Sequence, residues 1–253
     1  MPDQPRRALV TGGSRGIGRA IVERLAADGH EVVATARNAS SLQLLEVDAA
    51  TQGWTIASAA CDVTDDHAVD RLVLDHGPFD LVVANAGMAS AAPLHRTTTE
   101  DLQLALAVNA AGVFNTLHAT VPGMQERGWG RVVVVASTAG VTGAPYTSAY
   151  TASKHAAVGL VRAVASEVAG SAVTVNAVCP TYVDTDMTAA TIDRIAERTG
   201  RTVDEASDAL LAQVPLGRLV HPDEVAAAVA YLCSEAAAPI NGQTLILDGG
   251  GST

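Results

Sequence analysis

The sequence predicts a doubly wound α/β fold, in which helices cover both faces of one parallel β-sheet. Several short runs are apolar at nearly every position, which is typical of parallel strands buried on both faces. The segments between them are long enough for crossover helices. Seven runs rich in β-branched residues are the expected strands: RALVT, HEVVATAR, WTIASAAC, DLVVANA, RVVVVAS, VTVNAVC and TLILD.

Helical spacing of apolar residues marks the segments between these strands, and several of the segments end at a glycine that can close a helix. Because no linker, repeat or low-complexity tract interrupts the pattern, we expect a single domain over residues 1–253. The clearest helical segments are IGRAIVERLAADG, DHAVDRLVLDHG, TEDLQLALAVNAAGVFNTLHATVPGMQERG and SAYTASKHAAVGLVRAVASEVAG.

One stretch, residues 184–213, is polar and helical and has no strand of its own. Insertions at the carboxyl end of a parallel sheet lie over the ligand crevice, so we interpret this stretch as a small helical substrate cap. An ordinary pair of surface helices is the alternative.

Composition excludes several classes of partner. The formal net charge is −11, from 27 acidic and 16 basic residues, and no basic run is present that would bind nucleic acid or an anionic membrane. No uninterrupted apolar segment has the roughly 18 residues of a membrane span, and the N-terminus lacks a signal-peptide pattern, so a cytoplasmic protein is expected. Cys61, Cys179 and Cys233 are widely spaced among apolar residues, which favours buried thiols. No metal site is expected, since the histidines show no ligand spacing.

A glycine-rich turn follows the first expected strand in TGGSRGIGRA. Gly12, Gly16 and Gly18 stand where the strand meets the start of a helix, so backbone amides and the helix dipole can face a pyrophosphate. The motif predicts a Rossmann-type dinucleotide site, with a ligand-free glycine turn as the alternative.

The end of the second expected strand indicates which dinucleotide is bound. NAD enzymes place a carboxylate there for the ribose hydroxyls, but this chain has Thr35, Ala36 and Arg37. Arg37 and Arg15 can pair with the 2′-phosphate of NADP, because guanidinium groups match phosphate oxygens. NADP(H) is therefore favoured over NAD(H), unless these arginines only point into solvent.

Tyr150 and Lys154 are four residues apart in a helical segment, so they share one helix face. An ammonium near a phenol stabilises the phenolate and lowers the phenol pKa from its usual value of about 10. Ser137 follows the fifth strand, at the edge of the sheet where such folds bind ligands, and can hydrogen-bond a carbonyl oxygen. Taken singly, a tyrosine and a lysine at this spacing more often only decorate a helix, and a serine after a strand is more often only a helix cap.

Taken together, the motifs resemble those of the short-chain dehydrogenase/reductase family over almost the whole chain. Within the family the sequence is most similar to β-ketoacyl (3-oxoacyl) reductases and polyketide ketoreductases. The matching segments are TGGSRGIG, CDV at residues 61–63, ANAG at 84–87, Asn109, STAG from Ser137, YTASK at 150–154, CPTYVDT from Cys179, and INGQTLILDGG.

The resemblance implies a catalytic role for each of four residues. Tyr150 is the expected proton donor to the carbonyl oxygen, and Ser137 orients that oxygen. Lys154 holds the nicotinamide ribose and depresses the tyrosine pKa, while Asn109 supports a water that links the lysine to solvent. The cofactor contacts that it implies, together with those argued above, are Gly12, Ser14, Arg15, Gly16, Ile17, Gly18, Arg37, Asp62, Val63, Asn85, Ala86, Gly87, Tyr150, Lys154, Pro180, Val183 and Thr185.

One residue departs from the family pattern. Many relatives have a glycine after the proline of the CPTYVDT segment, but this chain has Thr181. A β-branched residue would strain a left-handed backbone at that position, so either the turn differs or strain is tolerated. The placement of Val183 and Thr185 at the nicotinamide depends on the answer.

The expected function is NADPH-dependent reduction of a ketone, as a 3-oxoacyl thioester or polyketide-like β-keto group, to a secondary alcohol. An NAD-dependent 3-hydroxyacyl-CoA or 3-hydroxybutyrate-type dehydrogenase and a non-catalytic nucleotide-sensing regulator are the alternatives. The resemblance further implies a homotetramer, with the helices around 102–125 and 150–168 pairing across a two-fold axis. Arg96, Arg127 and Arg131 are candidates for a carrier-protein docking patch, against the alternative of scattered surface charges.

Overall fold

The computed structural model describes residues 4–38, 40–212 and 214–252. Its centre is a seven-stranded sheet in the order β3-β2-β1-β4-β5-β6-β7, with every neighbouring pair parallel. The doubly wound fold predicted from the sequence is thereby confirmed. The strands are β1 (Arg7–Thr11), β2 (Glu31–Ala36), β3 (Ile56–Ala60), β4 (Leu81–Ala84), β5 (Gly130–Val135), β6 (Val173–Pro180) and β7 (Thr244–Leu247).

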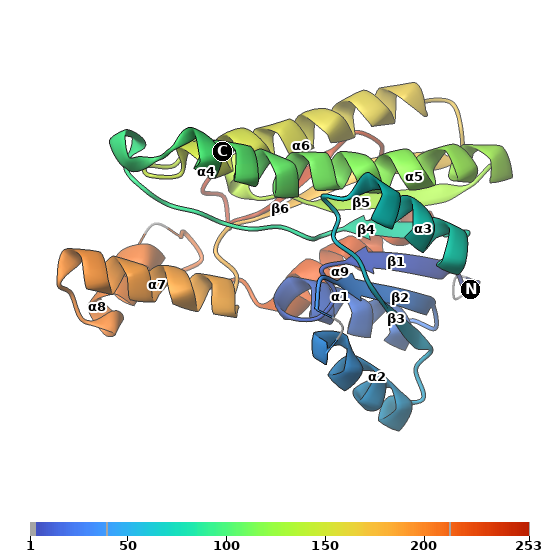
Figure 1. Cartoon of the computed structure of the whole chain (residues 1–253), viewed down its shortest axis with the longest axis horizontal. Helices are drawn as coiled ribbons and strands as arrows, with labels where there is room; N and C mark the ends of the chain where they lie inside the picture. The colour runs from blue at the N-terminus through green and yellow to red at the C-terminus, as the bar shows by residue number, and fades with distance from the viewer. Residues whose placement is uncertain (1–3, 39, 213, 253) are drawn as a thin grey trace.

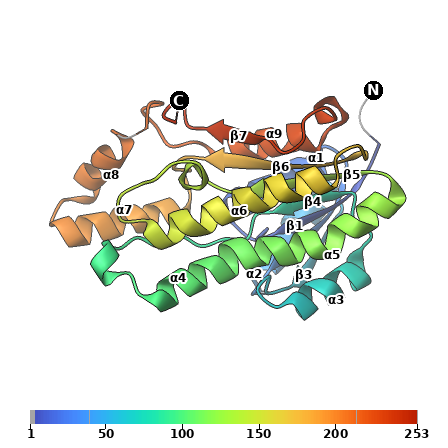
Figure 2. The same cartoon turned by 90° about the horizontal axis from the view of Figure 1, so that it is seen from above.

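Alternate residues of the central strands enter two separate hydrophobic cores, because successive side chains of a strand point to opposite faces. Val10 packs in one core and Leu9 in the other. Figures 1 and 2 show the resulting three layers, with the sheet between two groups of helices. One core is covered by α1 (Gly16–Ala27), α2 (Ser40–Gln52) and α9 (Pro222–Cys233), and the other by α3 (Asp66–His76), α5 (Gly112–Arg127) and α6 (Ser148–Glu167).

The strand order reverses between β1 and β4, which are neighbours in the sheet. The chain runs outward from β1 to β3 on one side and from β4 to β7 on the other. In such sheets the connections leaving the two central strands diverge at their carboxyl ends, and this divergence opens the crevice in which ligands bind. The residues that follow β1, β4 and β5 therefore border this crevice.

The long apolar segment between β4 and β5 is one helical rod with an irregular middle. It consists of α4 (Thr99–Leu106), a π-helical segment (Ala107–Ala111) and α5. By length and mean hydropathy this rod could cross a membrane, but 44% of its most apolar window is buried in the structure. A rod with one buried side is typical of a helix that covers a sheet, so its hydropathy is weak evidence for a span.

The described part of the predicted cap, residues 184–212, contains two helices, α7 (Asp186–Thr199) and α8 (Val203–Leu211), and residue 213 lies outside the described residues. Both helices project beyond the carboxyl ends of the strands, on the side of the molecule away from the N-terminus (Figures 1 and 2). Their facing sides share a small core of their own, formed by Ile192, Ala196, Ala206 and Leu210. The remaining short turns are the 3₁₀ helices η1 (Leu94–Arg96), η3 (Thr138–Gly140) and η4 (Glu235–Ala237).

Candidate active site

The glycine turn after β1 has a backbone that only glycine accommodates easily. Gly12 and Gly16 have φ angles of 67° and 55°, in the left-handed region. A Cβ atom on Gly12 would lie 2.9 Å from the Cα of Ala86, and one on Gly18 would overlap the carbonyl oxygen of Gly12. Helix α1 begins at Gly16, and no side chain caps its first amides. These residues fit the pyrophosphate of a dinucleotide, because the amides face an open, closely approachable turn.

The end of β4 is fastened to this glycine turn by a set of hydrogen bonds. The Nδ2 of Asn85 donates to the carbonyl oxygens of Thr11 and Gly12 at 3.0 and 3.1 Å. In return, the hydroxyl of Thr11 accepts from the backbone amides of Asn85 and Ala86 at 3.0 and 3.1 Å. Asn85 and Ala86 thus lie beside the glycine turn, where the sequence placed them. Thr11 was not predicted as part of the site, although its position as the last residue of β1 could have indicated it.

The residues expected at the adenosine end lie near one another. Hydrogen bonds from the backbone and side chain of Thr64 are the main cause that lowers the pKa of Asp62, and the charge of Arg37 lowers it further. Arg37 follows β2 directly and is exposed. Val63 is held from the other side, since its carbonyl oxygen accepts a hydrogen bond from the Asn115 side chain at 2.9 Å. A guanidinium group therefore stands where NAD enzymes carry a carboxylate.

The glycine turn also meets the start of α7. Arg15 lies 3.6 Å from the carboxylate of Asp186, and both side chains are largely exposed. A Cβ atom on Gly16 would lie 3.3 Å from the Cγ2 of Thr185. Two of the residues predicted to hold the cofactor from opposite ends of the sequence, Gly16 and Thr185, are therefore neighbours in space.

Ser137, Tyr150 and Lys154 converge at the carboxyl end of β5. Ser137 caps η3, and its side chain hydrogen-bonds with that of Tyr150. Lys154 is buried, and its ammonium donates to the carbonyl oxygen of Val135 at 3.0 Å. The same ammonium lies 6.0 Å from the centre of the Tyr150 ring. The structure thus brings together the three residues that sequence spacing and order suggested.

Burial has opposite effects on the two titratable groups of this cluster. It raises the pKa of the Tyr150 phenol above its ordinary value, and the hydrogen bond with Ser137 offsets this only in part. It lowers the pKa of Lys154 to about 8. In the protein without ligand, desolvation of the phenol dominates its pKa, and the expectation that Lys154 depresses the tyrosine pKa stays a prediction.

Asn109 is fully buried in the π-helical segment and joins three parts of the chain. Its Oδ1 accepts from the amide of Met88, and its Nδ2 donates to the carbonyl oxygen of Met88 and to the hydroxyl of Ser153, each at 2.9 Å. Ser153 in turn donates to the carbonyl oxygen of Tyr150 at 2.7 Å. Ser153 and Met88 are contributors that the sequence did not single out, since Ser153 is a small residue inside YTASK and Met88 acts through its backbone.

Gly87 completes this group because it leaves room for its neighbours. A Cβ atom on Gly87 would lie 3.1 Å from the Oδ1 of Asn109 and 3.5 Å from the Nζ of Lys154. The loop after β4, the π-helical segment and α6 therefore meet at this residue.

The segment after β6 shows no strain at Thr181. Among the described residues, the one non-glycine residue with a positive φ is Tyr146, so Thr181 does not adopt the left-handed backbone that was a concern. Its amide instead donates to the carbonyl oxygen of Leu247 at 3.0 Å. Two residues further on, Val183 pairs with Val220 in a parallel bridge, which fixes the approach to Thr185.

The cysteines are buried and unpaired, as predicted. Cys179 lies at the end of β6, close enough to Lys154 for the lysine charge to affect it, but burial dominates and raises the pKa of its thiol. Among the residues that the structure describes, no group of His, Cys, Asp and Glu side chains could hold a metal ion.

Two of the three arginines considered for a docking patch lie at the opposite end of the sheet from Ser137, Tyr150 and Lys154. Arg127 ends α5 and donates to the carbonyl oxygen of Phe79 at 2.6 Å, just before β4 begins. Arg131 is buried in β5, over the Trp129 ring and beside Glu235. Both stand at the amino end of the sheet, so the predicted patch is wrong for these two. Arg96, in η1 after β4, is exposed at the carboxyl end.

Comparison with known proteins agrees with this geometry. A family model described as "Enoyl-(Acyl carrier protein) reductase" matches residues 12–252. The 3-oxoacyl-[acyl-carrier-protein] reductase MabA of Mycobacterium tuberculosis is 38% identical over 98% of this chain and 94% of its own length. The acetoacetyl-CoA reductase of Rhizobium meliloti is 37% identical over 97% of this chain and 98% of its own length.

A solved structure is similar over the full length of both chains. The crystal structure of a variant of actinorhodin polyketide ketoreductase with NADPH has a TM-score of 0.94 and 36% sequence identity, with 100% of each chain covered. The match over the full chain includes the glycine turn and the Tyr150 region. The chain therefore belongs to the short-chain dehydrogenase/reductase family of NAD(P)-dependent oxidoreductases.

Proposed function

We propose that this protein uses NADPH to reduce the ketone of a 3-oxoacyl thioester, or a polyketide-like β-keto group, to a secondary alcohol. The observation that carries the proposal is the convergence of Ser137, Tyr150 and Lys154 beside the glycine turn, at the crevice of a doubly wound sheet. Similarity to two reductases that act on 3-oxoacyl thioesters, and to a polyketide ketoreductase, supports the substrate class.

Tyr150 is the proposed proton donor to the carbonyl oxygen. Because burial raises its pKa, the phenol is protonated at neutral pH and has a proton to give. Ser137, already hydrogen-bonded to the phenol, would hold the carbonyl oxygen against it. NADPH, when bound, supplies the hydride that reaches the carbonyl carbon.

Lys154 is proposed to hold the nicotinamide ribose and to stabilise the phenolate left after proton transfer. An ammonium has three donors, and among the described residues that of Lys154 donates to one acceptor, the Val135 carbonyl oxygen. The relay of a proton through a water at Asn109 stays a prediction. The carboxamide itself holds Met88 and Ser153, and so positions the first turns of α6.

The cofactor is proposed to lie across the carboxyl ends of β1 and β4. Arg37 and Arg15 would hold the 2′-phosphate, since guanidinium groups pair with phosphate. The end of β2 has no carboxylate in its sequence that would accept hydrogen bonds from the ribose hydroxyls of NAD. That absence disfavours the NAD-dependent dehydrogenase alternative. The complete set of Ser137, Tyr150 and Lys154 disfavours a non-catalytic regulator. The remaining proposed contacts are Gly12, Ser14, Gly16, Ile17, Gly18, Asp62, Val63, Asn85, Ala86, Gly87, Pro180, Val183 and Thr185, with residues 184–213 as the substrate cap.

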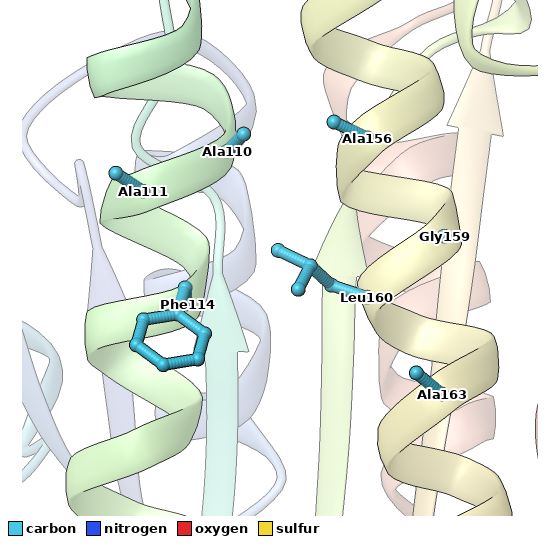
Figure 3. Close-up of a pocket in the computed structure, with 7 residues that line it drawn as sticks. All are labelled: Ala110, Ala111, Phe114, Ala156, Gly159, Leu160 and Ala163. Atoms are coloured by element: carbon cyan, nitrogen blue, oxygen red, sulfur yellow. The ribbon is translucent and has the colours of Figure 1, made fainter.

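An apolar groove between the π-helical segment, α5 and α6 supports the proposed oligomer. Figure 3 shows the side chain of Leu160 directed from α6 into the space between the two helices, with the Phe114 ring in front of α5. The cavity has a volume of about 510 Å³, and every residue lining it is apolar or glycine. Phe114 is 49% exposed in the single chain. We propose that a second copy of this chain covers the groove, because small residues along both helices allow close approach of another helix pair.

Replacement of Tyr150 by Phe tests the proton donor. We expect kcat for reduction of an acetoacetyl thioester to fall by a factor of about 10² or more, because the ring stays and only the acidic hydroxyl is lost. The Kd for NADPH, measured by fluorescence titration, should change little. Tyr231→Phe, at an exposed tyrosine of α9, is the matched control. Turnover of Tyr150→Phe near that of the unchanged protein would refute the assignment.

Replacement of Lys154 by Met tests the cost of the buried ammonium. A pKa lowered from 10.5 to about 8 means that burial of the charged form costs about 3 kcal/mol at pH 7, where folded and unfolded lysine are both protonated. Between pH 8 and 10.5 the folded protein loses this proton first, so the cost shrinks as pH rises. Lys154→Met should therefore be inactive but at least as stable as the original, with a larger advantage at pH 7 than at pH 9.5.

Thermal unfolding of both proteins at the two pH values measures this difference. A marked loss of stability in Lys154→Met at pH 7 would show that the hydrogen bond to Val135 outweighs the desolvation of the ammonium.

Replacement of Arg37 by Gln tests the choice of cofactor. We expect the KM for NADPH to rise by about tenfold or more, since a charge-assisted contact to phosphate is lost, and the KM for NADH to stay the same. Arg24→Gln, on the last turn of α1, is the control. Equal effects on the two cofactors would mean that Arg37 does not read the 2′-phosphate.

Replacement of Phe114 by Glu tests the interface. The unchanged chain, of 25.8 kDa, should have a multiple of that mass in light scattering, and a buried carboxylate should reduce the mass. Leu74→Glu, at another exposed apolar side chain, should leave it unchanged. A monomeric unchanged chain would contradict the proposal.

A further inference from the structure

Tyr146 has an unusual backbone in the segment that links η3 to α6. Its φ angle is 67°, and no other non-glycine residue among those described has a positive φ. A left-handed backbone is unfavourable for a large side chain, and residues in such conformations cluster at binding and catalytic sites. The side chain is also 67% exposed, so packing of the ring does not explain the conformation.

Contacts on both sides hold this segment at the edge of the crevice. The carbonyl oxygen of Tyr146 accepts a hydrogen bond from the amide of Ala92 at 2.8 Å, which joins the segment before α6 to the loop after β4. The neighbouring carbonyl oxygen of Ala91 accepts from the guanidinium of Arg198 at 3.1 Å. Arg198 lies in the last turn of α7, so the cap helix, the β4 loop and the Tyr146 segment meet here.

Aromatic residues are scarce in this chain, and three of its four tyrosines belong to segments around the proposed site. The sequence has four tyrosines, two phenylalanines and two tryptophans. Tyr146 lies four residues before Tyr150, in the turn that precedes α6, and Tyr182 is close enough to Tyr150 to raise its pKa. Of these three tyrosines, Tyr146 is the one whose side chain is mostly in solvent.

We infer that Tyr146 is a specificity-determining residue whose ring contacts the part of the ketone substrate that extends beyond the reacting carbonyl. The inference rests on the proposed function. The exposed ring of Tyr146, four residues before the proton donor, offers a flat apolar surface with few rotatable bonds. Such a surface binds planar or long apolar groups at low entropic cost. Such a contact favours extended substrates and leaves short ones unaffected.

Replacement of Tyr146 by Asn isolates the ring from the backbone, because asparagine tolerates the left-handed conformation. Two thioesters of the same small thiol serve as substrates, one with a 3-oxobutanoyl group and one with a 3-oxo-3-phenylpropanoyl group, each with NADPH. We expect kcat/KM for the phenyl substrate to fall about tenfold, mainly through KM. The value for the short substrate and the Kd for NADPH should stay within about twofold. Tyr231→Asn should change neither ratio.

A second variant, Tyr146→Gly, keeps the same backbone without any side chain and should show the same selectivity as Tyr146→Asn. Circular dichroism and thermal unfolding of both variants verify folding. Parallel losses on the two substrates, or no loss on either, would overturn the inference and leave the proposed function standing if the unchanged chain reduces the short ketone. No reduction of either ketone by the unchanged chain would overturn both.

Discussion

The buried carboxamide of Asn109 is the constraint on which the rest of the site depends. It contacts the β4 loop and α6 at once, through Met88 and Ser153, from within the rod that covers the sheet. A carboxamide carries both donors and an acceptor, so it can satisfy an amide, a carbonyl oxygen and a hydroxyl in one place. Through Ser153 and the Tyr150 carbonyl oxygen, it fixes the turn of α6 that carries the phenol.

A second constraint is the burial that makes the site reactive. Desolvation keeps Tyr150 protonated. It also makes Lys154 hold its proton less tightly than it would in water. A fold optimised for stability alone would place an apolar residue at position 154, since the ammonium gains one hydrogen bond in return for its lost hydration. The cluster is therefore a place where stability is given up for chemistry.

Most of the fold could be predicted from the sequence because strand periodicity is strong and local. All seven strands follow from runs of apolar residues. The helical character of the cap segment follows from the lack of such a run in it. Helices α2 and α9 were not among the clearest helical segments. The chain does mark the start of α9 with Pro222 and a capping box from His221 to Glu224, which a search for caps would have found. The irregular turn at Asn109 could not be foreseen, since it depends on contacts with the β4 loop.

Residue types and order indicated the members of the site, but not its electrostatics. Spacing alone places Lys154 on the helix face of Tyr150, but it cannot show that the ammonium is bonded to Val135, or that burial sets the sign of the tyrosine pKa shift. In the same way, Arg127 and Arg131 are close to Ser137 in sequence, yet the length of β5 separates them from it. Questions of charge and distance needed the three-dimensional structure.

The π-helical segment has a consequence for how insertions and deletions act on this protein. A π turn holds one residue more than an α turn, so removal of a single residue between 107 and 111 would restore regular α geometry. Every residue on the amino-terminal side would then rotate by about 100° relative to α5 and move by about 1.5 Å along the axis. The side of α4 that packs against α6 would then lose its register with α6. The length of this rod is therefore fixed to the residue.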